Sequence, residues 1–386
     1  MKYQRILNLA ELLKKKSFFL FGPRSTGKSH LIREQLQEQA FILNLLHSDL
    51  FLRLSENPSE LEALLQSKAA QEKKWIVIDE VQKIPELLNE VHRLIEERKL
   101  HFLLTGSSAR KLKRGQANLL AGRAWTANLF PLCFAEIPHF NLEHYLRFGG
   151  LPHVYTSKEP AEELDAYVQT YLKEEILAEG LIRKIPPFSR FLRAAALSNG
   201  QQLNFTEIGS DCQVAPSTIR EYYSILEDTL IGFLLEPWTA SKKRKASSTA
   251  KFYFFDTGVT HTIAGTKELD RNSNLYGNSF EQFIAMELRA YISYRRIKES
   301  LSFWRSTHGY EVDFLIGNKI AIEVKASKKA DIRACKGLQA LQEEKVFKTF
   351  YFVSQDPLEM KKAGIHFIHW KDFLTRLWSD ELLGKL

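Results

Sequence analysis

A short apolar segment that runs directly into a glycine-rich loop constrains the fold of this chain more than any other feature. Residues 17–21 are almost all apolar, and Gly22-Pro23-Arg24-Ser25-Thr26-Gly27-Lys28-Ser29 follows at once. This loop fits G-x-x-x-x-G-K-[ST], and a helix-like segment over 31–38 comes next. The glycines let the backbone wrap around an anion, and the N–H groups of the loop and the helix N-terminus face it. Strand, loop and helix in this order predict a phosphate-binding P-loop.

The last residues of the loop predict the ligand. Lys28 has the position that reaches β- and γ-phosphates, and Ser29 has the position that holds Mg²⁺. We therefore expect residues 22–29 to bind ATP with Mg²⁺. A chance match in an ordinary turn is the alternative, and the strand before the loop and the helix after it argue against that alternative.

A second motif places two carboxylates after another apolar strand. Residues 75–78 are Trp-Ile-Val-Ile and lead straight into Asp79 and Glu80. In P-loop NTPases this place holds the acidic residue of the Mg²⁺ shell. We expect Asp79 to bind Mg²⁺ through water and Glu80 to act as the general base that polarises the attacking water.

The next predicted strand, 101–104, ends in small polar residues. Thr105 and Ser107 are candidates to sense the γ-phosphate, although Ser107 suits a helix N-cap equally well. Hydrolysis also needs a positive charge for the transition state, for which Arg110 and Arg123 are candidates. For either arginine alone, a solvated surface position is the simpler interpretation.

The order of apolar and charged segments predicts an α/β fold for the first third of the chain. Nearly continuous apolar runs at 17–21, 41–45, 75–78 and 101–104 are typical of strands buried on both faces. Charged segments with helical periodicity lie between them, as in a parallel sheet with crossover helices.

The middle of the chain is predicted to be helical. Phe205–Cys212 and Pro216–Leu226 flank a short turn and predict a helix-turn-helix. A polar, basic loop over 238–250 follows, and strands, a long helix over 278–294 and a strand pair around Gly317-Asn318 come after it.

Composition limits the remaining possibilities. Lys and Arg number 54 against 46 Asp and Glu, a net charge of +8 that permits contact with polyanions without requiring it. Cys133, Cys212 and Cys335 are too few and too far apart for a disulfide framework or a zinc site. No apolar run is long enough to span a membrane and no signal-peptide pattern is visible, so we expect a cytoplasmic protein without a membrane partner.

The ATPase motifs and several later ones resemble the prokaryotic AAA+-like ATPases that carry a C-terminal domain of unknown function. The resemblance runs over nearly the whole chain and implies an AAA+-like P-loop ATPase domain (1–160), a helical linker with a winged helix-turn-helix (161–245) and a PD-(D/E)XK nuclease-like domain (246–386). It also implies a homo-oligomer, because AAA+-like sites usually need a neighbouring subunit. Besides the P-loop and Ile78-Asp79-Glu80, the matching motifs are Leu104-Thr105-Gly106-Ser107-Ser108-Ala109-Arg110, Leu120-Ala121-Gly122-Arg123-Ala124, Phe148-Gly149-Gly150-Leu151-Pro152, Phe254-Phe255-Asp256-Thr257-Gly258, Trp304-Arg305 and Glu311-Val312-Asp313-Phe314.

The strand pair 311–316 and 320–325 carries the residues of the nuclease-like hypothesis. A three-residue loop (317–319) would set Asp313 opposite Glu323, with Lys325 on the same face. These residues would then be catalytic, with Asp313 and Glu323 holding a metal ion, Lys325 positioning water and Glu281 adding a third carboxylate. A two-residue loop would shift the register and separate them, and a hairpin with ordinary surface charges is the alternative.

Nucleic-acid contact has two candidate surfaces. Ser217, Thr218, Arg220, Glu221 and Ser224 fall on the outer face of the second helix of the helix-turn-helix, and Lys242-Lys243-Arg244-Lys245 suits phosphate contact. Arg220 and 242–245 are therefore the candidate contacts for DNA, and the alternative is that both surfaces are merely solvated.

Two outputs of the ATPase stay open. The first is metal-dependent binding or cleavage of DNA by the C-terminal half. The second is a nucleotide-controlled signalling or assembly switch in which the nuclease-like domain is inactive and binds protein.

Overall fold

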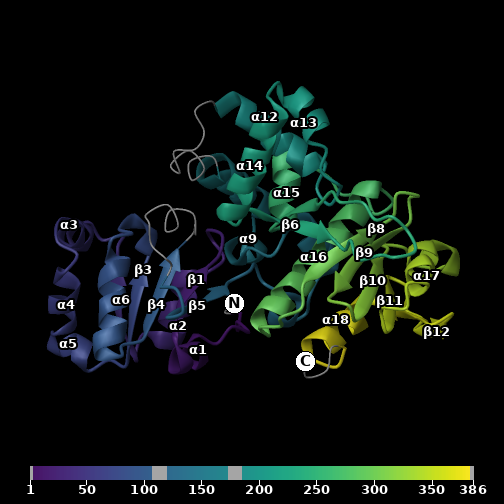
Figure 1. The fold of residues 1–386 in the computed structure, drawn as a ribbon. Helices are drawn as coiled ribbons and strands as arrows, with labels where there is room; N and C mark the ends of the chain where they lie inside the picture. The colour runs from purple at the N-terminus through teal and green to yellow at the C-terminus, as the bar shows by residue number, and fades with distance from the viewer. Residues whose placement is uncertain (1–2, 107–119, 173–184, 383–386) are drawn as a thin grey trace. The chain divides into compact units, whose positions relative to one another are not determined.

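The computed structural model describes residues 3–106, 120–172 and 185–382 and forms two compact units (Figure 1). Unit 1 comprises Met1–Leu132 together with Asp228–Ile231. Unit 2 comprises Cys133–Glu227 and Gly232–Leu386.

Unit 1 is built on a five-stranded sheet whose strands all pair in parallel. The predicted parallel α/β fold is confirmed here, and each of the four predicted strands lies within two residues of an observed one. The spatial order is β2 (Ala40–Asn44), β3 (Trp75–Asp79), β4 (Phe102–Gly106), β1 (Ser17–Phe21) and β5 (Ala124–Asn128).

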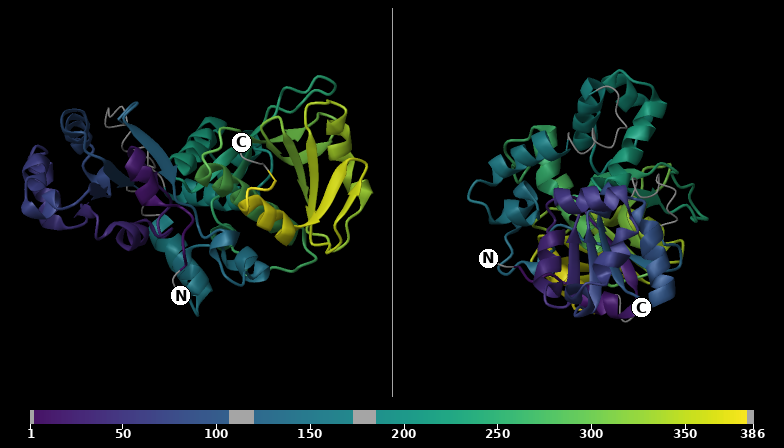
Figure 2. Two further views of the ribbon diagram at one scale, coloured as in Figure 1. Left: turned by 90° about the horizontal axis from the view of Figure 1, so that it is seen from below. Right: turned by 90° about the vertical axis from the view of Figure 1, so that its left-hand side faces the viewer.

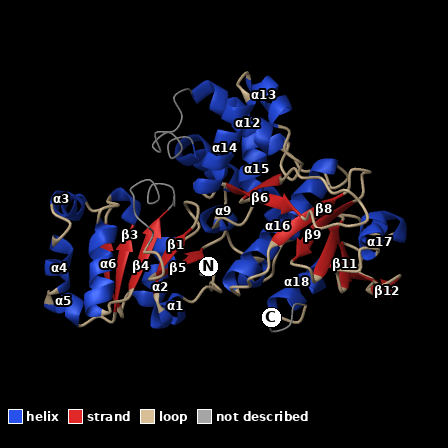
Figure 3. Ribbon diagram, in the orientation of Figure 1, coloured by secondary structure: helices blue, strands red, loops and turns tan. Residues whose placement is uncertain are grey.

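Helices flank this sheet, as the blue and red ribbons of Figure 3 show. Alternate side chains of β1, β3 and β4, such as Phe19, Ile78 and Leu104, form one buried cluster with the helical residues Leu61 and Val91. The helices are α1 (Leu9–Lys15), α2 (Lys28–Leu36), α3 (Ser48–Glu56), α4 (Glu60–Leu65), α5 (Lys68–Gln71) and α6 (Leu87–Arg98), with a short turn η1 (Val81–Lys83) after β3.

The first helix, α1, begins at Leu9 and is capped by the residue before it. The side chain of Asn8 accepts a hydrogen bond from Glu11 N at 3.0 Å, which makes Asn8 the N-cap of α1. Residues before this cap are therefore free to take other contacts, and Arg5 does so at the P-loop.

Unit 2 begins with helices. The two helices of the predicted helix-turn-helix are present, and the second one buries Ile219, Tyr222, Tyr223, Ile225 and Leu226. No helix in the described ranges combines the length and apolarity needed to cross a membrane. The helices are η2 (Phe134–Glu136), α8 (Leu142–Phe148), α9 (Pro152–Thr156), α10 (Pro160–Ala166), η3 (Tyr167–Leu172), α12 (Ile185–Leu197), α13 (Phe205–Cys212), α14 (Pro216–Asp228), α15 (Thr257–Ala264), α16 (Asn274–Tyr294), η4 (Ile332–Cys335), α17 (Lys336–Gln342) and α18 (Trp370–Trp378).

An eight-stranded mixed sheet forms the rest of unit 2, with α16 packed against it (Figure 2). The strand β6 lies before residue 245 in the chain and pairs with β7, which lies after it. The strand β6 also pairs with β8 and so continues the sheet. The domain boundaries at 160 and 245 stay predictions. The strand order is β12 (Met360–Lys362), β13 (Ile365–His369), β11 (Thr349–Ser354), β10 (Ile320–Val324), β9 (Glu311–Ile316), β8 (Leu301–Arg305), β6 (Gly232–Pro237) and β7 (Lys251–Phe254).

Two of the family-like motifs lock together inside unit 2. The buried carboxylate of Asp256 caps α15 by accepting from Val259 N at 3.0 Å, and it also accepts from Gly150 N at 2.8 Å. A Cβ atom at Gly149 would collide with this carboxylate, and one at Gly258 would collide with Phe148 O. The glycines in both motifs therefore allow the two segments to approach closely, which is a structural role.

Candidate functional site

The predicted nucleotide-binding residues meet at one edge of the unit 1 sheet. The strands β3, β4 and β1 are neighbours and run parallel, so their carboxyl ends lie side by side. The P-loop follows β1, Asp79 ends β3, and Thr105 lies near the end of β4. Ligands of open parallel sheets bind at this edge.

The backbone of the P-loop has the conformation of an anion cradle. Ser25 and Gly27 have left-handed φ values of 64° and 94°, and α2 starts directly after Gly27. Thr26 Oγ1 donates to Pro23 O at 2.8 Å and braces the loop from within. A Cβ atom at Gly22 would lie 2.5 Å from Leu129 O, so a larger residue would push the loop off the sheet.

Lys28 is the buried cation of this loop. Its side-chain ammonium donates to Gly22 O at 2.5 Å and to Pro23 O at 3.0 Å. The amine therefore lies within the loop, close to the loop carbonyls. A phosphate bound there would be a charged partner for it.

The Asp79 carboxylate joins the P-loop to β4. Ser29 Oγ donates to Asp79 Oδ2 at 2.8 Å, and Thr105 Oγ1 donates to Asp79 Oδ1. The backbone N–H of Glu80 donates to Thr105 Oγ1 at 3.0 Å. A hydroxyl and a carboxylate thus converge as hard oxygen donors, which is the chemistry that Mg²⁺ prefers.

Glu80 leaves the line of its strand. Its φ of 64° is left-handed, and its Oε2 accepts a hydrogen bond from Gln82 Nε2 at 2.5 Å. Burial raises the pKa of the Glu80 carboxyl; Lys28 and Gln82 oppose this rise, and Asp79 adds to it.

Of the candidates Ser107, Arg110 and Arg123, the structure describes only Arg123. Arg123 Nε donates to Glu96 across the surface of unit 1, and no contact between Arg123 and the loop is observed among the described residues. Ser107 and Arg110 lie outside the described residues.

Arg5 is a P-loop contact that the sequence analysis missed. It donates to Thr26 O at 2.9 Å and to Phe130 O at 2.6 Å, which ties the loop to the segment after β5. An isolated arginine in a polar segment gives no sequence signal for this role.

The C-terminal strand pair has the three-residue loop that the sequence analysis considered first. The register places Ile322 opposite Phe314, so that Glu323 comes opposite Asp313. Lys325 Nζ lies 2.6 Å from Glu323 Oε1 and 3.5 Å from Asp313 Oδ2. Burial and Asp313 hold the pKa of Glu323 well above its ordinary range.

Glu281 reaches the same region but has other partners. It accepts from Tyr253 Oη at 2.5 Å and pairs with Lys251 Nζ at 3.3 Å, and Lys251 also pairs with Glu311 at 2.6 Å. We call Glu281, Glu311, Asp313 and Glu323 the acidic cluster.

The metal site predicted from Glu281, Asp313 and Glu323 stays a prediction. Within the described ranges, no group of three His, Cys, Asp or Glu side chains is arranged to hold a metal ion. Lys251 and Lys325 lie among the four carboxylates of the acidic cluster and offset part of their negative charge. The residues as arranged form an ion network, in which Glu323 Oε2 is buried without a hydrogen-bond partner among the described residues.

The candidate nucleic-acid residues are engaged within unit 2. The Arg220 guanidinium lies over the Phe205 ring at 4.9 Å. The backbone N–H groups of Lys242 and Lys243 donate to Glu344, and Arg244 pairs with Glu343 at 3.0 Å. The basic loop is therefore held against α17, and its lysine side chains are exposed.

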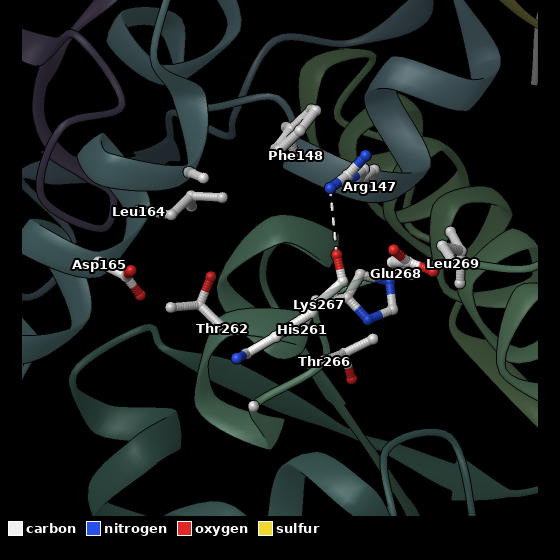
Figure 4. A pocket seen from close by; sticks show the side chains of 12 residues that line it. Arg147, Phe148, Leu164, Asp165, His261, Thr262, Thr266, Lys267, Glu268 and Leu269 are labelled. Carbon is white, nitrogen blue, oxygen red and sulfur yellow. Dashed lines mark hydrogen bonds between the residues drawn. The ribbon is translucent and has the colours of Figure 1, made fainter.

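A separate pocket of about 310 Å³ lies among α8, α10 and α15 (Figure 4). Phe148 and Leu164 give it an apolar wall, and Arg147 Nη2 donates to Lys267 O at 3.1 Å along its rim. Burial lowers the pKa of His261, at the inner end, to about 4. None of the predicted site residues lines this pocket.

Three family models match successive segments of this chain. Residues 14–138 match a family model described as "AAA domain", residues 139–270 match "Domain of unknown function (DUF8612)", and residues 276–373 match "Domain of unknown function (DUF4143)". A protein of Haemophilus influenzae named "Uncharacterized protein" is 24% identical over 295 residues, which cover 69% of this chain and 72% of the relative. An uncharacterized protein of Methanocaldococcus jannaschii is 22% identical over an alignment 396 residues long, gaps included, which spans 94% of this chain and 84% of the relative.

These matches confirm the expected AAA-type, P-loop ATPase-like domain at the N-terminus and a C-terminal domain of unknown function. They support ATP binding and hydrolysis in general terms. The winged-helix and nuclease-like parts of the resemblance stay predictions.

Proposed function

We propose that unit 1 binds ATP with Mg²⁺ and hydrolyses it at the P-loop edge of the sheet. The observation that carries this proposal is the Asp79 carboxylate held between Ser29 Oγ and Thr105 Oγ1, beside the buried Lys28. A chance match to the motif in an ordinary turn would not bring these four side chains together from the ends of three strands.

Each residue has a distinct task in this proposal. The loop N–H groups and Lys28 bind the phosphates, and Ser29 and Asp79 hold Mg²⁺, which when bound neutralises charge on the phosphate oxygens. Glu80 accepts a proton from the attacking water. Thr105 keeps Asp79 in place and fixes the backbone of Glu80 through its N–H group.

An ATPase assay with matched variants tests the proposal. Glu80→Gln should retain ATP binding and keep only a small, measurable residual turnover, whereas Lys28→Ala should lose both binding and turnover. Lys99→Ala, at an exposed position at the end of α6, is the control and should behave as the wild type. Turnover that survives in both Glu80→Gln and Lys28→Ala would contradict the proposed site.

For unit 2 we propose the role of an output module in a nucleotide-controlled switch. The specific observation in favour of the switch over DNA cleavage is that Glu281, the predicted third carboxylate of the cleavage site, pairs with Lys251 and accepts from Tyr253 Oη instead. The switch would act on a protein partner or on assembly of a homo-oligomer, which an AAA-type site commonly needs to supply its arginine.

The alternative output, metal-dependent DNA binding and cleavage, is decided by one assay. Plasmid and linear DNA are incubated with the protein and Mg²⁺ or Mn²⁺, beside Asp313→Ala and Lys325→Ala. Cleavage by the wild type that both variants lose would overturn the switch proposal. Intact DNA in every lane, with no retention in a low-salt gel shift, would support it.

A further inference from the structure

Gln82 is a nearly buried polar residue at the nucleotide edge to which no role has been assigned. It is 8% exposed and lies two residues after Glu80, in the turn η1. Its side-chain nitrogen Nε2 donates to Glu80 Oε2 at 2.5 Å. A buried amide at this distance from the proposed general base is a direct constraint on where that carboxylate points.

The turn that carries Gln82 is anchored on both sides. Val81 and Ile84 are buried in the cluster under the sheet, at 0% and 3% exposure. Lys83 Nζ donates to Leu45 O at 3.0 Å and holds the turn to the end of β2. Because its backbone is fixed in this way, Gln82 presents its amide from a defined position.

Glu80 needs such a contact because its backbone alone does not orient it. The left-handed φ of 64° costs about 1–2 kcal/mol in a residue with a Cβ atom. In this conformation the Glu80 carboxylate accepts a hydrogen bond from Gln82 Nε2, which restricts the orientation of the side chain.

Gly106 provides the room for the amide of Gln82. A Cβ atom at Gly106 would lie 2.8 Å from Gln82 Oε1 and 3.6 Å from a Phe21 ring carbon. The backbone at Gly106 is not left-handed, so a Cβ atom here would displace the Gln82 amide without straining the backbone. Gly106 directly follows Thr105 at the end of β4. Thr105, which donates to Asp79, and Gln82, which donates to Glu80, therefore lie at the same end of this strand.

From these contacts we infer that Gln82 is a positioning residue that holds the Glu80 carboxylate in the orientation needed to accept a proton from water. This inference rests on the proposed ATPase function. Gln82 does not touch the phosphates in this account, so it acts on turnover and not on nucleotide affinity.

The test compares steady-state ATP hydrolysis by the wild type, Gln82→Met, Gly106→Ala, Glu80→Gln and the double variant Glu80→Gln with Gln82→Met. Methionine keeps the length of glutamine and lacks the donor. Gln82→Met should lower kcat about 10- to 100-fold, the range for lost supporting contacts, with KM for ATP within about twofold of the wild type. Gly106→Ala should shift the same amide and lower kcat in the same direction.

The double variant gives the readout that a merely structural role would not move. If Gln82 acts through Glu80, the double variant should hydrolyse ATP no more slowly than Glu80→Gln alone. An unchanged kcat in Gln82→Met, a parallel rise in KM, or a further full loss in the double variant would each overturn the inference. If Gln82→Met does not fold, the same decision rests on Gly106→Ala with and without Glu80→Gln. A wild type without any ATP turnover would refute the proposed function and this inference together, whereas normal turnover in Gln82→Met refutes the inference alone.

Discussion

Replacing Lys251 by methionine should destabilise unit 2 strongly, because Lys251 is the buried cation of the acidic cluster. Its side chain is 4% exposed and pairs with Glu311 at 2.6 Å and with Glu281 at 3.3 Å. Burial alone would lower the pKa of Lys251, but Tyr253 and Glu281, with the other carboxylates, hold it well above its ordinary value. The amine is therefore charged in the folded protein at neutral pH.

The size of the effect follows from the burial of the partners. Removing one member of a buried ion pair costs about 3–5 kcal/mol, since the remaining charges stay buried without compensation. Glu281 and Glu311 are 19% and 28% exposed, so water relieves part of this penalty and the lower end, about 3 kcal/mol, applies. Methionine preserves the apolar stem, which limits the change to the charge.

Scanning calorimetry of the full chain measures this loss. About 3 kcal/mol should lower the melting temperature of unit 2 by about 6–12 °C. The matched control is Lys319→Met, whose pair with Glu299 at 3.0 Å is exposed (44% and 33%). Such surface pairs contribute about 1 kcal/mol or less. A Lys251→Met protein that melts within about 2 °C of this control would refute the account of the acidic cluster as an ion network.

Two further predictions concern buried acids and their donors. Thr105→Val removes the hydroxyl that donates to Asp79 and accepts from the backbone N–H of Glu80. ATP turnover should therefore fall about 10-fold or more, while the affinity for ATP, measured by calorimetry, changes little. Equal losses of turnover and affinity would contradict the role assigned to Thr105. Burial raises the pKa of Glu287 from 4.5 to about 8, although its carboxylate accepts a hydrogen bond from Trp378 Nε1, so this group stabilises the fold at low pH and the contribution is lost as pH rises toward 8. The free energy of unfolding of the wild type, measured with urea, should fall by up to about 1.4 kcal/mol per pH unit between pH 5 and 8, and Glu287→Gln should lack that slope. Identical slopes in the two proteins would contradict this prediction.

The P-loop edge was predictable because its signals are local in the sequence. Residues 22–29, Asp79-Glu80 and Thr105 each follow directly on an apolar run, and parallel strands bring such ends together. The pairing of Asp313 with Glu323 was one of two registers that the sequence allowed, and the three-residue loop of the folded chain selects it.

Residues that depend on distant partners escaped prediction. Arg5 meets Phe130 across 125 positions, and Lys251 meets Glu281 across 30. No periodicity or motif encodes such a pair, so the ion network that occupies the acidic cluster emerges only from the folded chain. The same lack of local signal hid Gln82, whose role depends on the space left at Gly106.

Equilibrium binding of ATP in the presence of Mg²⁺, measured by titration calorimetry on the wild type and Lys28→Ala, tests the central claim most directly. The account predicts saturable binding of one ATP per chain by the wild type and a loss of at least tenfold in affinity for Lys28→Ala, because its ammonium is the buried cation of the loop. Equal affinity in the two proteins, or no binding by the folded wild type, would contradict it.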